Sequence, residues 1–190
     1  NVMKDISWSD NLLKGLKSIN SEYVMLLIDD LLITNKISND YFFKIKNWID
    51  NNKPEYLKLN ISNKPEKFDN LIGKIPKKSS YKTSTMPSVW KKEILKKLLK
   101  KGESAWEFES KGSLRAYDYD NFFSVNKNFI NYKNSIIKGK WQKNLNLNLE
   151  INETARPIMS IFEQTIYNLK VLRSKLFNFL PAYFRILFRK

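Results

Sequence analysis

Asp29 and Asp30 are two adjacent carboxylates that directly follow an apolar run at residues 23–28. Such a run predicts a buried strand of an α/β sheet, which would bring its acids to the carboxyl edge where these sheets bind ligands. Buried acids need a cation. Because the nearest basic residue along the chain is Lys36, a divalent metal held by oxygen atoms is the natural partner. The same pair is also compatible with the cap of a following helix or with a solvated turn.

The chain contains no histidine and no cysteine. A general base that works near neutral pH therefore has to be a carboxylate, a lysine or a tyrosine. A metal site has to be rich in oxygen ligands, which suits Mg²⁺ or Mn²⁺ better than zinc. Disulfides and cysteine zinc sites are excluded for this sequence.

A second pair of acids, Glu107 and Glu109, follows Gly102. Ser104 is expected to cap a short helix, and Glu107 would then stand at the position that completes a capping box. Residues two apart on a helix point to nearly opposite sides, so the two glutamates are not expected to face one substrate together. If Glu107 serves the cap, Glu109 is the better candidate for a base.

The elements around these acids have to position them. Apolar residues recur at helical spacing between Leu12 and Ile19, after Ser9, which we expect to cap this helix. The strand at 23–28 follows, and a second amphipathic helix is predicted over residues 39–50. This order of helix, strand, acidic pair and helix predicts an α/β fold with a doubly wound sheet flanked by helices.

Five short segments, taken in order, carry a resemblance to a known family. They are Trp8-Ser9-Asp10-Asn11-Leu12-Leu13, residues 21–30, Pro87-Ser88-Val89-Trp90, Trp106-Glu107-Phe108-Glu109 and Gly139-Lys140-Trp141. In this order and spacing the chain resembles bacterial glycosyltransferases of the GT-A fold, over most of residues 6–141. The resemblance implies a Rossmann-like mixed sheet and a nucleotide-sugar-dependent enzyme of envelope polysaccharide assembly.

The resemblance also implies roles for particular residues. Asp29 and Asp30 would hold Mg²⁺ or Mn²⁺ against the donor diphosphate as a DxD-like motif, although here the acids are adjacent and Leu31 follows them. Glu109 or Glu107 would activate the acceptor hydroxyl. The residues expected to bind substrate are Trp90, Trp106, Lys138, Lys140 and Trp141. Gly139 between two lysines would form a loop that closes over the diphosphate, with a solvated turn as the alternative.

We expect two parts in the chain: a partial GT-A-like catalytic domain at 1–143 and a helical, amphipathic tail at 144–190. The nucleoside-binding opening of such a domain has no counterpart before the first helix, so we expect the sequence to be part of a longer protein. Apolar and basic residues alternate from Arg173 to Lys190, which is typical of an interfacial membrane helix. Packing on the domain or on a partner is the alternative.

The net charge of +15, from 34 basic and 19 acidic residues, indicates a polyanionic partner. Only five of the basic residues are arginines, so sequence-specific binding of nucleic acid is not expected. The expected partners are a nucleotide-sugar donor, a saccharide or lipid-linked acceptor and an anionic membrane surface. No apolar run of spanning length and no signal peptide is present. The resemblance implies a cytoplasmic protein, peripheral on the inner face of the cell membrane. The alternative is a non-enzymatic basic protein that binds anionic membrane or nucleic acid.

Overall fold

The computed structural model describes residues 6–61, 65–79, 81–143 and 156–179, with side chains of the last helix described as far as Arg173. The chain divides into two compact units, Asn1–Lys133 and Asn134–Lys190. This division lies ten residues before the one expected at 143, because the Gly-Lys-Trp segment pairs with residues of the second unit. A membrane-binding tail is expected between Arg173 and Lys190. Residues 180–190 of it lie outside the described residues, and only the backbone is described for residues 174–179.

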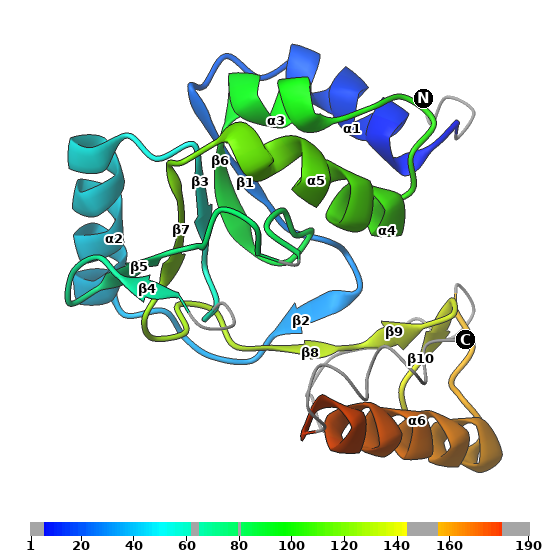
Figure 1. Ribbon diagram of the computed structural model, residues 1–190. Coiled ribbons are helices and arrows are strands. Elements are labelled where there is room, and N and C mark those ends of the chain that lie inside the picture. The colour runs from blue at the N-terminus through cyan, green and yellow to red at the C-terminus, as the bar shows by residue number, and fades with distance from the viewer. Residues whose placement is uncertain (1–5, 62–64, 80, 144–155, 180–190) are drawn as a thin grey trace. The chain divides into compact units, whose positions relative to one another are not determined.

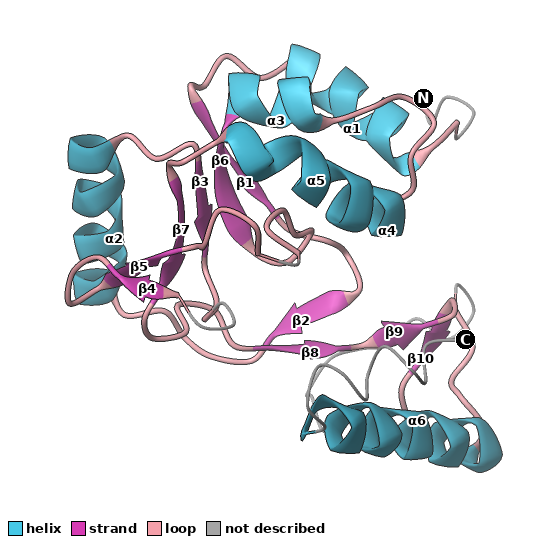
Figure 2. Ribbon diagram, in the orientation of Figure 1, coloured by secondary structure: helices cyan, strands magenta, loops and turns pink. Residues whose placement is uncertain are grey.

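The first unit contains a six-stranded mixed sheet (Figures 1 and 2). In spatial order its strands are β1 (Tyr23–Leu26), β6 (Ser88–Lys91), β3 (Tyr56–Lys58), β7 (Phe122–Val125), β5 (Ile72–Lys74) and β4 (Glu66–Lys67). The neighbours β3 and β7 run parallel, and all other neighbouring strands run antiparallel. The predicted mixed α/β class is therefore confirmed.

Helices cover both faces of this sheet (Figure 2). On one side lies α2 (Asn39–Asn52). On the other side lie α1 (Trp8–Lys17), α3 (Lys92–Leu98) and a continuous helical segment composed of α4 (Ala105–Glu107), η1 (Phe108–Gly112), α5 (Ser113–Arg115) and η2 (Ala116–Asp118). The cap of α1 is Ser7, whose hydroxyl accepts from the amide of Asp10. The predicted cap, Ser9, is instead fully buried and donates to the carbonyl of Lys100.

Each face has its own apolar core. Beneath α2 the core contains Ile45 and Trp48 of the helix, together with Leu57 and Phe123 of the sheet. On the opposite face, aromatic rings of three adjacent central strands pack together. They are Trp90, Tyr56 and Phe122, with the Tyr56 ring centroid 4.2 Å from that of Trp90 and 5.2 Å from that of Phe122. Because both faces are covered, the polar residues of the central strands have to find partners inside the fold.

The strand before the acidic pair is an edge strand. β1 pairs only with β6 among the described strands, so it lies at an edge and the buried position predicted for it is wrong. Its outward residue Met25 is 47 % exposed, which an edge position explains and a doubly covered central strand would not. The chain then turns at Asp29 and Asp30 and enters β2 (Leu31–Ile33), which pairs with β8 (Tyr132–Asn134).

The second unit contains a hairpin and a long helix. The hairpin joins β9 (Ile136–Ile137) to β10 (Lys140–Trp141), and the helix is α6 (Ile161–Phe179). Two residues with positive φ, Lys138 at 51° and Gly139 at 77°, form the turn. Positive φ at both central residues is the geometry of the tight turns that close antiparallel hairpins. No helix within the described residues is long and apolar enough to cross a membrane.

Candidate functional site

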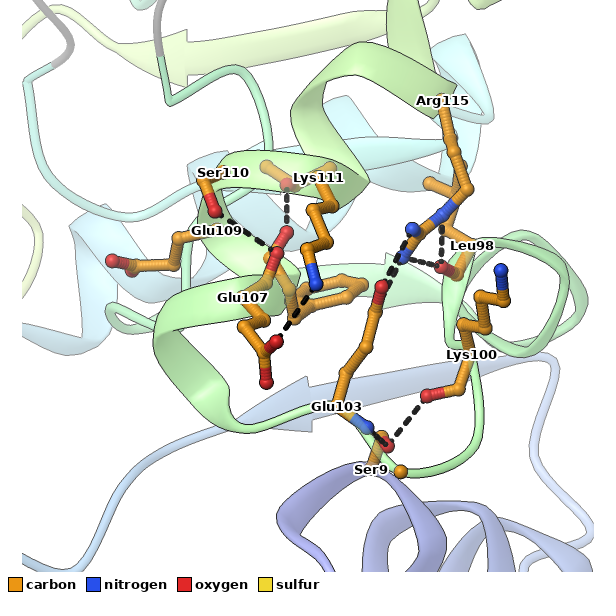
Figure 3. A network of polar contacts seen from close by, with 12 residues as sticks. Ser9, Leu98, Lys100, Glu103, Glu107, Glu109, Ser110, Lys111 and Arg115 are labelled. Carbon is orange, nitrogen blue, oxygen red and sulfur yellow. Dashed lines mark hydrogen bonds and ion pairs between the residues drawn. The ribbon is translucent and has the colours of Figure 1, made fainter.

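The helical segment that carries both candidate bases begins at the predicted capping box. The Ser104 hydroxyl accepts from the amide of Glu107, and the Glu107 carboxylate accepts from the amide of Ser104 at 2.9 Å. The other carboxylate oxygen accepts from Lys111 at 2.7 Å (Figure 3). Lys111 and then the Ser104 cap lower the pKa of Glu107 to about 2. A carboxylate with so low a pKa is a weak base at neutral pH, so Glu107 serves the helix terminus.

Glu109 is held differently, because only one of its carboxylate oxygens is engaged. Oε1 accepts from the Ser84 hydroxyl at 3.0 Å, the Thr85 amide at 2.8 Å and the Thr85 hydroxyl at 2.9 Å. Oε2 accepts no hydrogen bond from a residue that the structure describes. Figure 3 shows Glu109 and Glu107 pointing in different directions, as their spacing predicts. The side chain is thus fixed in orientation and keeps one oxygen for a further donor.

The backbone around Glu109 forms one turn of π-helix, η1. The Thr83 hydroxyl donates to the carbonyl of Phe108, and the Ser113 hydroxyl donates to the carbonyl of Glu109. A Cβ at Gly112 would lie 3.1 Å from the Phe108 ring and 3.2 Å from the Thr83 hydroxyl, so this close packing suits a glycine. Turns of π-helix occur frequently at functional sites, where the extra residue changes the direction of a side chain.

Residues 82–85 form a loop of four consecutive polar residues that are each no more than 5 % exposed. Ser84 and Thr85 of this loop bind Glu109. Lys82 donates to the carbonyl of Tyr119, and its ammonium lies 5.1 Å from the centre of the Phe122 ring. Burial lowers the pKa of Lys82. Buried loops are uncommon because their polar groups need hydrogen-bond partners. Here the helical segment that carries Glu109 supplies the partners of residues 83–85, and the carbonyl of Tyr119 just after it supplies that of Lys82.

A row of polar residues crosses the sheet beside the aromatic row. Lys58 at the end of β3 lies opposite Ser88 on β6 and Ser124 on β7. Residues opposite each other in neighbouring strands lie on the same face of the sheet. Lys58 is two residues after Tyr56 on β3, so it lies on the same face as Tyr56, and Leu57 lies on the other face. The row thus lies at the carboxyl end of the parallel pair, on the face that the Glu109 segment covers. In α/β sheets this end is the usual place for ligands.

Lys58 of this row and Tyr132 of β8 both interact electrostatically with Glu109. Burial lowers the pKa of Lys58, and the negative charge of Glu109 opposes that shift. For Tyr132, burial and then the Glu109 charge raise the pKa. Among the described residues, the ammonium of Lys58 has no hydrogen-bond acceptor and the buried hydroxyl of Ser124 has no hydrogen-bond partner. The Lys58 ammonium, the Ser124 hydroxyl and the second carboxylate oxygen of Glu109 can therefore each form a hydrogen bond with a polar ligand.

Sequence patterns did not point to Lys58, Ser84, Thr85 or Ser124. The signal that could have found Lys58 is its position on a strand that has apolar residues on both faces. A lysine there has to be either at an edge or in a site. Ser84 and Thr85 belong to a run of small polar residues that looks like an ordinary surface turn.

Asp29 and Asp30 lie in the turn between β1 and β2, where Asp29 is exposed and Asp30 is half-buried. Nowhere in the part of the chain that the structure describes do three or more acidic residues gather as a set of metal ligands. Two carboxylates suit Mg²⁺ or Mn²⁺ when phosphate oxygens of a substrate and water complete the coordination. The donor set of this pair fits such an ion, and the metal site stays a prediction.

The predicted substrate-binding residues have three different environments. Trp90 is completely buried, and its indole donates to the Ser88 hydroxyl at 3.0 Å, so it belongs to the core and has no surface for a substrate. Trp106 is 80 % exposed at the start of the helical segment. The other three belong to the second unit, where Lys138 is in the hairpin turn and Lys140 contacts Glu163 at 2.6 Å. The amide of Trp141 donates to the carbonyl of Pro157.

The low pKa of Glu107 predicts a pH dependence of stability. Because its pKa is about 2 in the folded protein, below the 4.5 that is ordinary for a glutamate, the ionised carboxylate stabilises the fold above about pH 4.5. This stabilisation is lost as the pH falls towards 2. We therefore expect the urea midpoints of the wild type and Glu107→Gln to differ at neutral pH and to converge between about pH 4.5 and 2. A difference that stays constant down to pH 2 would contradict the contacts with Lys111 and Ser104.

Comparisons with protein-family models, with curated proteins and with solved structures found no match for this chain.

Proposed function

We propose that the first unit is a GT-A-like glycosyltransferase domain that moves a sugar from a nucleotide-sugar donor to a hydroxyl of a saccharide or lipid-linked acceptor. The observation that supports this function best is the environment of Glu109. Its carboxylate is held at one oxygen by Ser84 and Thr85, while the other oxygen accepts nothing from the described residues. A fixed carboxylate with one oxygen available is suited to remove a proton from a hydroxyl.

In this proposal Glu109 is the general base. Its Oε2 accepts the proton of the acceptor hydroxyl while the hydroxyl oxygen attacks the anomeric carbon. The bond from that carbon to the donor phosphate oxygen breaks, and its electron pair leaves with the nucleotide. The displacement inverts the configuration of the anomeric carbon. Lys58 and Ser124 would hold hydroxyl groups of a sugar beside the base, which fixes the distance between the reacting atoms.

Asp29 and Asp30 are proposed to hold Mg²⁺ or Mn²⁺ at the donor diphosphate. The ion, when bound, would neutralise the negative charge that develops on the departing nucleotide. Trp106 is proposed to offer its exposed ring to a sugar. The role proposed for Lys138 and Lys140 is to bind phosphate; Lys138 is exposed in the hairpin turn, whereas Lys140 is engaged with Glu163.

The function is tested by incubating the chain with a panel of nucleotide sugars and measuring nucleotide release in the presence of Mg²⁺ or Mn²⁺. We expect release that EDTA abolishes and that Asp29→Asn lowers on the order of 100-fold, because the ion contributes several kcal/mol to the transition state. Asp40→Asn is the matched control, since Asp40 is an exposed acid of α2 that pairs with Lys44. Release that is insensitive to EDTA would contradict the metal site, and no release from any donor would contradict the function.

The second candidate is a non-enzymatic basic protein that binds a polyanion, and the net charge of +15 favours it. Under this function Asp29→Asn leaves binding to anionic vesicles or nucleic acid unchanged. Binding then weakens with salt in the same way for the wild type and the variant. Salt titrations of the two proteins beside the release assay therefore separate the candidates.

A further inference from the structure

Helix α6 packs its polar side inward. Glu163 pairs with Lys140 of the hairpin, and Gln164 is 7 % exposed with its side-chain carbonyl accepting from the amide of Lys143. The Gln164 amide also donates to Gln142 and Asn168. An amphipathic helix on the surface of a globular protein normally does the opposite and turns its apolar stripe towards the core.

The apolar residues of α6 are on the exposed side. They are Ile161 at 69 %, Phe162 at 73 %, Ile166 at 37 %, Leu169 at 60 % and Leu172 at 53 % exposed. At about 100° per residue these five positions fall within an arc of roughly 140° on the helix, so they form one continuous stripe. Single exposed apolar residues are ordinary, but a stripe of this length marks an interaction surface.

Basic residues accompany the stripe. Arg173 falls between Ile166 and Leu169 on the helical projection, and Lys170 falls at its border; both are exposed. From residue 134 onward the sequence contains ten basic and three acidic residues. We propose that α6 docks in the plane of an anionic membrane, with the stripe in the acyl boundary and these cations at the lipid phosphates.

The positive charge of Lys170 and Arg173 favours an anionic lipid surface over other binding partners of the α6 stripe. A second copy of this part of the chain has the same excess of basic residues and offers few acidic partners to Lys170 and Arg173, and unpaired like charges destabilise an interface. An anionic bilayer satisfies the apolar stripe and the cations together. The proposal does not depend on glycosyl transfer, because its test uses no sugar donor.

The test is flotation of the full chain with phosphatidylcholine vesicles that either contain or lack phosphatidylglycerol. We expect the wild type to float with the anionic vesicles and to be released by high salt. Phe162→Glu combined with Leu169→Glu should weaken binding on the order of tenfold or more, because charges replace the residues in the acyl boundary. Phe43→Glu on α2 is the matched control, since Phe43 is 57 % exposed and lies outside the stripe.

A second variant keeps the stripe intact. Lys170→Gln combined with Arg173→Gln should lower binding to anionic vesicles by about fivefold per cation while flotation with neutral vesicles stays the same. Circular dichroism of all variants verifies that α6 remains folded. The proposal is overturned if the wild type does not float or if both double variants float as the wild type does. It is also overturned if light scattering shows a wild-type dimer that Phe162→Glu with Leu169→Glu converts to a monomer without any flotation.

Discussion

Glu109→Gln is expected to lower the turnover of sugar transfer by about 100- to 10,000-fold, the range that a general base contributes. The amide oxygen of glutamine can accept the same three hydrogen bonds from Ser84 and Thr85, so the side chain keeps its place and loses only its ability to take a proton. The Michaelis constant for the donor should change little, because the interaction that is lost belongs to the transition state. Initial rates of nucleotide release with and without acceptor measure both quantities.

Glu107→Gln is the matched control for this substitution, because it changes the same residue type two positions earlier on the same helical segment. Its carboxylate is engaged by Ser104 and Lys111, so the change should lower stability and leave turnover unaffected. The opposite pattern, with turnover lost in Glu107→Gln and kept in Glu109→Gln, would exchange the roles of the two residues. Equal turnover in both variants would remove both from the mechanism.

Glu103→Ala is expected to lower the free energy of unfolding by about 3 kcal/mol, the lower end of the range for removing one partner of a buried ion pair, because the Arg115 side chain is 30 % exposed. The Glu103 side chain is 6 % exposed and accepts two hydrogen bonds from Arg115, at 2.8 and 2.6 Å (Figure 3). Arg115 also donates to the carbonyl of Leu98, and the amide of Glu103 donates to Ser9. The pair therefore joins α1, the end of α3 and α5, and its loss leaves a guanidinium without its carboxylate.

Urea unfolding followed by circular dichroism measures this loss. Asp40→Ala is the control, because its exposed pair with Lys44 on α2 should contribute only about 0.3–0.5 kcal/mol. Glu103→Leu combined with Arg115→Met should recover much of the stability, since apolar residues of similar size replace both charges at once. If Glu103→Ala costs no more than the control, the pair contributes little and the three helices are held by apolar packing alone.

Features that depend on neighbours in the sequence were determined by the sequence itself. The capping box of Ser104 and Glu107 joins residues three apart, and the divergence of Glu107 and Glu109 follows from helical geometry. The helix at 39–50 and the mixed α/β class follow from the periodicity of apolar residues, which is a local property.

Only the tertiary structure decided how distant segments meet. The run at 23–28 has the composition of a buried strand, but strand order is set by pairing with β6, and this places it at an edge. Lys58, Ser88 and Ser124 share one row because β3 pairs with β6 and β7, which no local pattern encodes. The apolar stripe of α6 was visible in the sequence, but its direction was set by the polar contacts of Glu163 and Gln164. Local propensity fixes which elements form, whereas long-range pairing and packing fix which residues they bring together.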